Sequence, residues 1–107
     1  MRYLLMVAGE RAPEPGEMDG CGGWSEEMET RGIVRGGGGL RPPAAAVTVR
    51  VRDGEVLLSD GPFAETKEQV GGFSVIDCAD LDEAIEVAAK HPAAAFGMIE
   101  LRPIVET

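Results

Sequence analysis

The stretch "FSVIDCADLDEAIEVAAKHPAAAFGMIELRP", residues 73–103, decides the fold because it predicts a strand, a helix and a second strand in succession. Its first part, Phe73–Cys78, is apolar on both alternating faces, which is typical of a strand covered on two sides. Asp80 and Glu83 form a capping-box pattern, which predicts that a helix begins directly after Asp80. Phe96–Arg102 then predicts the second strand.

The predicted helix carries an apolar stripe and a histidine near its end. We expect the residues of this stripe to face the core, and they are Leu81, Ala84, Ile85 and Ala88. His91 falls in the last turn, directly before Pro92. A protonated imidazole is favoured there by the helix dipole, so we expect His91 to be a cation.

The N-terminal part of the chain predicts further elements around this unit. The uninterrupted apolar run Tyr3–Ala8 is typical of a strand covered on both faces. Residues 23–31 predict a helix, with Gly32 as its stop. Residues 33–40, "IVRGGGGL", predict an irregular, bulged strand that another backbone approaches closely. They lack the Lys-Ser/Thr of a phosphate-binding loop and do not lead into a helix.

A β-hairpin is predicted by "VTVRVRDGEVLLSD", residues 47–60. Asp53-Gly54 is a two-residue turn signal between strands at 47–52 and 55–59. The valines of the first strand face one way, and Thr48 and the arginines face the other. We therefore expect a half-exposed hairpin.

The order strand, helix, strand, hairpin, strand, helix, strand predicts an α+β fold. An antiparallel sheet would carry two helices on one face, and residues 1–107 would form a single domain. The helices would cover only one face of the sheet, although three of the strands are apolar on both faces. We expect a second copy of the chain to cover the other face, sheet against sheet, as a homodimer.

Composition argues against several classes of partner. The chain has 19 acidic and 10 basic residues, a net charge of −9, and no basic stripe, so we expect neither nucleic acid nor an anionic membrane as a partner. Cys21 and Cys78 show no metal-ligand spacing, so no metal site is expected and both are expected to be free thiols. The apolar runs are too short for a signal sequence or a membrane span, so we expect a cytoplasmic protein.

The stretch "DGPFAETKEQVGGFSVIDCADLDEAIEVAAKHPAA", residues 60–94, resembles the DGPF signature of the YCII-related (DGPF-domain) family. "MRYLLMV" and "MIELRPI" are similar to the ends of that family. The resemblance implies a ferredoxin-like βαβ(ββ)βαβ fold that pairs as a dimeric α/β barrel. It implies little about activity, because most members have no established one. A His–Asp pair suggested for YCII-like proteins does not carry over to His91, the one histidine here. Some members are encoded beside extracytoplasmic-function sigma factors, which implies a regulatory alternative.

Two carboxylates are the candidate catalytic groups. Asp60 is either a turn residue that accepts backbone N–H bonds, or a base or orienting group at the mouth of a cleft. Glu100 shares one side of its strand with Phe96 and Met98. If that side faces the dimer barrel, the apolar surroundings would raise the pKa of Glu100 and prepare it as a base. The alternatives are an ion pair with an arginine or a solvated rim.

The candidate ligand contacts are Phe63, Thr66, Lys67 and Trp24. Phe63 could also anchor its loop in the core, and Trp24 could be an ordinary core residue. Gly61 and Pro62 are expected to set the backbone turn of this loop, by permissive and fixed φ respectively.

The function we expect is binding of a small, largely apolar molecule in the cleft between the sheet and the helices. If the protein is catalytic, we expect cofactor-free acid–base chemistry, a lyase- or isomerase-like proton shift. The alternative from another class is a non-enzymatic regulatory or interaction module, acting with an extracytoplasmic-function sigma factor.

Overall fold

The computed structural model describes residues 1–10, 20–64 and 68–106. In chain order the elements are β1 (Arg2–Gly9), α1 (Cys21–Thr30), β2 (Val34–Gly39), η1 (Pro43–Ala45), β3 (Val47–Arg52), β4 (Glu55–Asp60), β5 (Gln69–Asp77), α2 (Leu81–Ala89), η2 (Pro92–Ala95) and β6 (Met98–Pro103).

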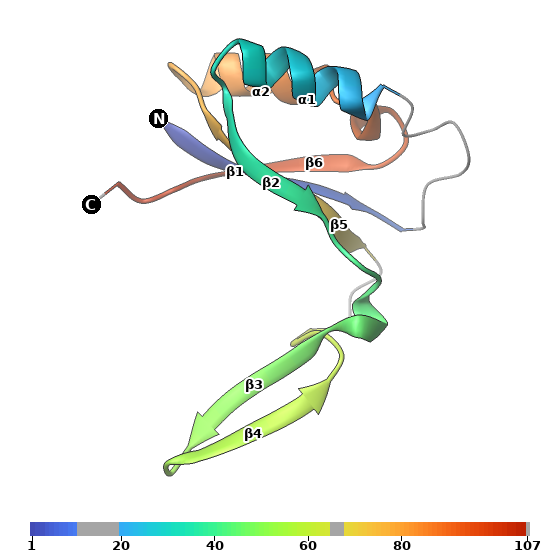
Figure 1. The fold of residues 1–107 in the computed structure, drawn as a ribbon, viewed down its shortest axis with the longest axis vertical. Helices are drawn as coiled ribbons and strands as arrows, with labels where there is room; N and C mark the ends of the chain where they lie inside the picture. The colour runs from blue at the N-terminus through green and yellow to red at the C-terminus, as the bar shows by residue number, and fades with distance from the viewer. Residues whose placement is uncertain (11–19, 65–67, 107) are drawn as a thin grey trace.

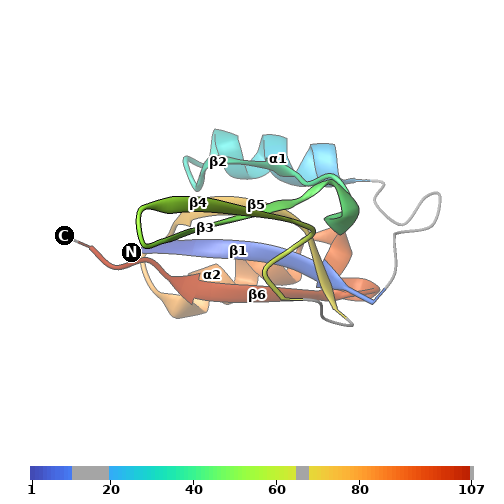
Figure 2. The same cartoon turned by 90° about the horizontal axis from the view of Figure 1, so that it is seen from below.

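Four strands form an antiparallel sheet in the order β2-β5-β1-β6, and both helices lie on one face of it (Figure 1). α1 lies toward the β2 edge and α2 toward the β6 edge (Figure 2). β3 and β4 form a separate two-stranded sheet that projects on the side away from the helices (Figures 1 and 2). The predicted α+β fold, with an antiparallel sheet and two helices on one face, is therefore confirmed.

The core lies between the helices and the sheet because the helix-facing strand positions are apolar. Tyr3, Leu5 and Ile76 face the helices and are fully buried. Met28 of α1 and Val87 of α2, also fully buried, belong to the same cluster. Burial of a side chain of this size contributes about 1.5–3 kcal/mol to folding, so this one cluster anchors both helices.

Helix α2 begins as predicted but presents a different face to the core. The N–H of Glu83 donates to Oδ1 of Asp80 at 2.9 Å, so the predicted cap at Asp80 is confirmed. The side chain of Glu83 accepts from the N–H of Ala79 at 3.0 Å, one residue before the position that a capping box uses. The predicted stripe is half wrong, because Leu81 and Ile85 are each 51% exposed. The buried face is instead Ala84, Val87 and Ala88. The apolar positions of α2 fit two overlapping stripes, and packing against Trp24 selects the one that contains Val87.

The ends of two strands differ from the prediction. β5 begins at Gln69 rather than Phe73, because residues 69–72 still pair with β1. β6 begins at Met98 rather than Phe96, because Pro92 starts the short helix η2. A Cβ on Gly97 would lie 2.4 Å from the carbonyl oxygen of Ala8, so only glycine fits that close passage into β6.

Strand β2 is bulged and closely approached, as predicted. Its pairing with β5 shifts register between Val34 and Gly36. Gly37 has φ +150, and a Cβ there would lie 2.2 Å from the carbonyl oxygen of Phe73. The backbones of β2 and β5 can approach this closely only without that Cβ.

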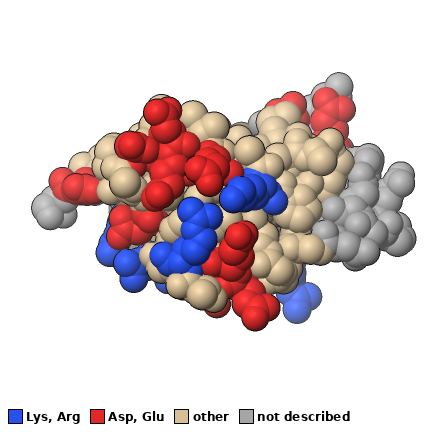
Figure 3. Space-filling view, turned by 90° about the horizontal axis from the view of Figure 1, so that it is seen from above, with Lys and Arg blue, Asp and Glu red and all other residues tan. Residues whose placement is uncertain are grey.

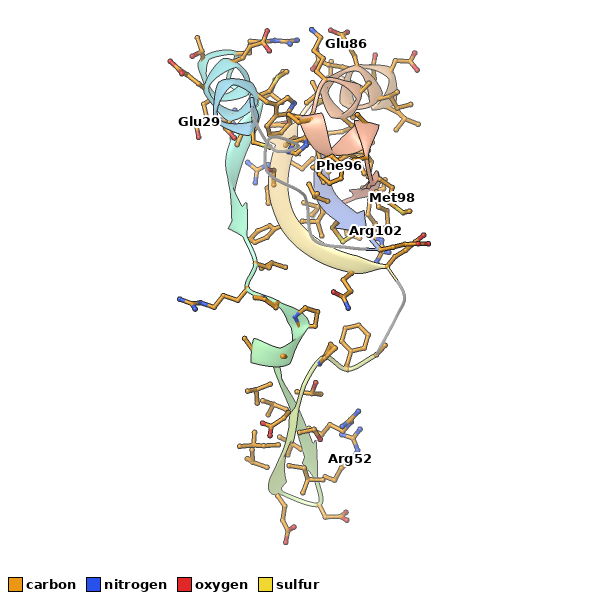
Figure 4. All side chains as sticks on the ribbon, turned by 90° about the vertical axis from the view of Figure 1, so that its right-hand side faces the viewer. Glu29, Arg52, Glu86, Phe96, Met98 and Arg102 are labelled. Carbon is orange, nitrogen blue, oxygen red and sulfur yellow. The ribbon has the colours of Figure 1, made fainter. Side chains whose placement is uncertain are left out.

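The face of the four-stranded sheet that points away from the helices is called the open face below. It alternates with the core positions and carries mainly apolar side chains, which are Leu4, Met6, Phe73, Val75 and Met98. Phe73 is 38% exposed and Met98 40% exposed. In the described part of the chain, neither α1 nor α2 covers this face (Figure 4). The prediction that the strands are apolar on both sides is confirmed.

The hairpin of β3 and β4, residues 47–60, is called the arm below. The predicted two-residue turn is confirmed, and the positive φ of Asp53 and Gly54, 52 and 78, is typical of type I′. The prediction of a half-exposed hairpin is wrong, because the side chains of both arm faces are largely exposed. A strand pair can be half buried only where another layer lies against it, and the arm extends beyond the body of the chain (Figure 1).

Candidate functional site

A cavity of about 330 Å³ lies between α1 and the strands β2 and β5. Helix α1 supplies Cys21, Trp24, Ser25 and Glu29 to its lining, and the segment after α2 supplies His91. The opposite wall is formed mainly by glycines of β2 and β5. This cavity is the cleft between sheet and helices in which a ligand was expected.

The glycine wall explains why the cavity exists. Val7 pairs with Gly72, and Gly72 pairs with Gly39, so all three positions lie on the helix-facing side of the sheet. Elsewhere on this side the strands carry large side chains such as Leu5, which fill the space below the helices. A Cβ on Gly39 would meet nothing within 4 Å, and its φ is not in the left-handed region. Neither packing nor backbone conformation requires glycine at position 39, and its effect is to leave room.

Trp24 closes the cavity from the helix side. It is 5% exposed, and its Nε1–H donates to the carbonyl oxygen of Val87 at 3.0 Å. Its ring meets the ring of His91 edge-on, with 4.7 Å between centroids and 68° between planes. Trp24 is thus a core residue that also lines the cavity, and its role as a ligand contact stays a prediction.

His91 is buried and uncharged, and the predicted helix-end cation is wrong. Nδ1 accepts the N–H of Ala93 at 3.0 Å, so the side chain caps η2 instead of binding the carbonyls of α2. Burial lowers the pKa of His91 below the ordinary 6.5. Because Nδ1 is an acceptor, the neutral imidazole carries its proton on Nε2. The sequence signal was the His-Pro pair, since the residue before proline leaves the helical region and can cap the next turn.

The remaining polar side chains of the cavity are Cys21, Ser25 and Glu29 of α1 and Ser74 of β5. Ser25 is half-buried, and Glu29 lies on the outward side of the helix, where it is exposed (Figure 4). Burial raises the pKa of the Cys21 thiol, so this group is uncharged at neutral pH. The arrangement places an N–H group and O–H groups around an indole, which suits a small ring compound that bears oxygen atoms.

The outer surface of the helices is acidic with a smaller basic group (Figure 3). No continuous basic stripe appears on this face of the described residues, which agrees with the charge argument against nucleic acid. Within the described ranges, no three metal-ligating side chains come together, and no helix is long and apolar enough to cross a membrane. No disulfide joins Cys21 and Cys78.

The DGPF loop lies at the root of the arm, away from this cavity. Gly61 has φ +93, and its N–H donates to the carbonyl oxygen of Ala46 at 2.7 Å. Oγ1 of Thr48 donates to the carbonyl oxygen of Gly61 at 2.8 Å. The loop thereby fastens the two ends of the arm to each other. The expectation that Gly61 sets a backbone turn agrees with this geometry.

A second concavity of about 940 Å³ is lined by both chain segments at the arm root, including Pro62 and Phe63. Phe63 is 86% exposed, so the alternative that it anchors the loop in the core is wrong. Asp60 ends β4 opposite Val47 and is exposed. Thr66 and Lys67 lie outside the described residues.

Glu100 lies on the open face and not in the cavity. Its Oε2 accepts from Nη2 of Arg102 at 2.6 Å, and both side chains are more than half exposed. The ion pair is the arginine alternative weighed from the sequence. Within one chain, the structure brings together Trp24 and His91 but neither Asp60 nor Glu100 with them. Their catalytic roles stay predictions.

The sequence matches a known protein family and an uncharacterised relative. The family model described as the YCII-related domain matches residues 1–107. An uncharacterised protein of Rhizobium meliloti (strain 1021) is 51% identical over 67 residues, which are 61% of this chain and 54% of that protein. The chain thus spans about half the length of the curated relative that it matches.

A solved structure has the same fold. It is 5-chloro-2-hydroxyhydroquinone dehydrochlorinase from Burkholderia phenoliruptrix AC1100, in complex with 2,5-dihydroxybenzoquinone. The TM-score is 0.52, the sequence identity is 16%, and the match covers 100% of this chain and 96% of that chain. At this identity the likeness concerns the fold, and it agrees with the predicted ferredoxin-like architecture.

Proposed function

Because the chain belongs to the YCII-related domain family, we propose that it binds a small molecule in the cavity between Trp24, His91 and the glycine wall. The observation that carries the proposal is the glycine at position 39. An ordinary strand residue would fit there sterically, because a Cβ at position 39 would meet nothing within 4 Å. Because Gly39 lines the cavity, such a residue would take up part of its space, and a chain without a ligand has no need of glycine there.

The lining favours a small cyclic or aromatic compound with at least one oxygen acceptor. A volume of about 330 Å³ lies at the lower end of the range of small-molecule pockets. Trp24 offers an apolar ring surface, and the Nε2–H of His91 offers a hydrogen-bond donor. The dehydrochlorinase of similar fold is named for a hydroxylated ring compound and was solved with another, which supports this class of ligand.

If the protein is an enzyme, the chemistry that suits these groups is a proton shift without a cofactor. His91 would hydrogen-bond a carbonyl oxygen and stabilise the enolate formed on it. A carboxylate would take the proton from the neighbouring carbon, and the proton would return at another atom. Glu29 is the carboxylate that lines the cavity, whereas Asp60 and Glu100 stay candidates that a second copy would have to bring closer.

Two glycines of β2 provide the test. Trp24 is the single tryptophan, so intrinsic fluorescence reports on the cavity wall. We expect 2,5-dihydroxybenzoquinone, or another member of a panel of hydroxylated quinones and aromatic acids, to change this fluorescence saturably. Gly39→Val should weaken the binding at least about tenfold, or about 1.4 kcal/mol. Gly38→Val is the matched control. The backbone of Gly38 also lines the cavity, but position 38 has equal space and a side chain there would lie on the open face.

Equal affinities in the two variants would contradict the proposed site. The absence of a saturable signal across the whole panel would contradict the proposed ligand class. Fluorescence of free tryptophan in the same solutions corrects for absorption by the quinones.

We also propose that the functional unit is a homodimer paired through the open face. Phe73 and Met98 expose apolar surface there, and large apolar patches on one chain are usually covered by a partner. A dimer would place Glu100 of each copy near the interface, beside Met6 and Met98. A cytoplasmic location stays part of this proposal.

A non-enzymatic interaction module remains the second candidate, and the exposed arm favours it. Such a module, including one that acts with an extracytoplasmic-function sigma factor, needs a partner surface but no ligand. Saturable binding at Trp24 that Gly39→Val abolishes would decide against it as the sole function.

A further inference from the structure

One face of the arm is aliphatic except for Asp60, which pairs with Val47 at the arm root. Cross-strand pairing joins Val49 to Leu58 and Val51 to Val56, with Val47 beside them. These five residues are called the aliphatic arm face. Each exposes more than half of its surface, from 57% at Val51 to 67% at Leu58.

The opposite face of the arm is polar. It carries Thr48, Arg50, Arg52, Glu55 and Ser59, with Leu57 as its aliphatic member. Arg52 projects on this side in Figure 4. The alternation is that of a strand pair with one face built for burial and the other for water.

The arm has no layer against it within the described chain. β3 and β4 form a sheet of their own, and an isolated two-stranded hairpin is only marginally stable in water. At its root, however, the arm is fixed by the hydrogen bonds of Gly61 with Ala46 and Thr48. A hairpin held in a defined direction with an exposed aliphatic face is typical of a surface that a partner covers.

The open face indicates which partner this is. The arm projects on the same side of the sheet as the open face, away from the helices (Figures 1 and 4). One chain thus presents two apolar surfaces at an angle, and a single occupant that covers both must carry two matching surfaces. A second copy related by two-fold symmetry has them by construction, because in an isologous contact each surface of one copy recurs on the other.

We propose that the arm is a dimerisation arm whose aliphatic face is buried by a second copy of the chain. The inference rests on the homodimer proposed above and adds the arm to its interface. Both copies would contribute an arm face and an open face, so the contact would cover four apolar surfaces. A membrane fits less well, because Asp53 and Glu55 lie at the arm tip and the chain has a net charge of −9.

Adjacent leucines on opposite arm faces provide the test. Leu58 belongs to the aliphatic arm face, and Leu57 lies on the polar face opposite Arg50. Analytical ultracentrifugation of the full chain over a range of concentrations gives the dimer dissociation constant. We expect Leu58→Glu to raise this constant at least about tenfold, since it would bury an unpaired carboxylate, whereas Leu57→Glu leaves it unchanged.

Met98→Glu distinguishes a failure of the dimer proposal from a failure of the arm proposal, because Met98 lies on the open face outside the arm. A monomeric wild type would overturn both proposals. A dimer that Met98→Glu weakens, but that Leu58→Glu and Leu57→Glu affect alike, would overturn the role of the arm alone. A foreign protein on the arm would show in the same way, as a dimer insensitive to Leu58→Glu. Unchanged circular dichroism of the variants controls for folding.

Discussion

His91 has a fixed orientation and a buried imidazole, and both decide which chemistry it can perform. Its Nδ1 caps η2, its ring meets Trp24, and its burial favours the neutral form. The N–H of Ala93 and the ring of Trp24 belong to different elements, and together they orient the imidazole. Such a fixed neutral imidazole is a hydrogen-bond donor rather than a base at neutral pH.

The lowered pKa of His91 predicts a pH dependence of stability. The unfolded chain binds a proton near pH 6.5, whereas the folded chain resists it until lower pH. Between the two pKa values the unfolded state binds more protons, so stability falls as pH falls. The slope is at most about 1.4 kcal/mol per pH unit from this group.

His91→Asn is the matched variant for this prediction, because an Asn oxygen can still accept the N–H of Ala93 but does not titrate. Urea unfolding at several pH values below 6.5, and above the range in which carboxylates titrate, should show the slope in the wild type and lose it in the variant. The same slope in both proteins would contradict the assignment to His91.

At the scale of elements, β2 shows glycine used in two different ways. Gly37 is required by the backbone, because its φ is +150 and a Cβ would overlap the carbonyl of Phe73. Gly38 and Gly39 are not required in this sense. This run of glycines therefore contains one glycine that the backbone requires, Gly37, beside two that another residue could replace sterically.

Gly37→Ala should destabilise the fold strongly, by about 3 kcal/mol or more, because strain and overlap with fixed backbone add. Gly38→Ala should change stability by less than about 1 kcal/mol, with glycine removal in a strand favourable if anything. Thermal unfolding of both variants checks the difference. Similar melting temperatures would show that β2 does not approach β5 as described.

The helices and strands were predictable from the sequence where a few consecutive residues determine where they begin or end. The helix cap at Asp80 and the turn at Asp53-Gly54 each involve a few consecutive residues, so the sequence alone predicts them. The buried stripe of α2 was only half predictable, because its rotation is set by Trp24, a residue far away in sequence. The exposure of the arm depends on the absence of a neighbouring layer, which no local pattern contains.

At the scale of the whole molecule, two surfaces are separated by the sheet. The cavity lies on the helix side, and the open face and the arm lie on the other side (Figure 1). We therefore predict that Gly39→Val impairs the proposed ligand binding without affecting the proposed dimer, and that Leu58→Glu does the reverse.

The candidate site was less predictable than the fold. The sequence pointed to Trp24, but the cavity arises because Gly39 and Gly72 are paired across two strands, and that register is a tertiary property. The neutral state of His91 likewise depends on burial beneath α1. The DGPF loop was predicted from its motif to matter, and in the structure its hydrogen bonds join the two ends of the arm.

The measurement that tests the central claim most directly is native mass spectrometry of the protein purified gently from its host, with Gly39→Val prepared in parallel. We predict a dimer of the wild type that carries a small additional mass, and a Gly39→Val dimer that lacks it. A bare wild-type protein, or the same additional mass on both proteins, would contradict a ligand site at the glycine wall.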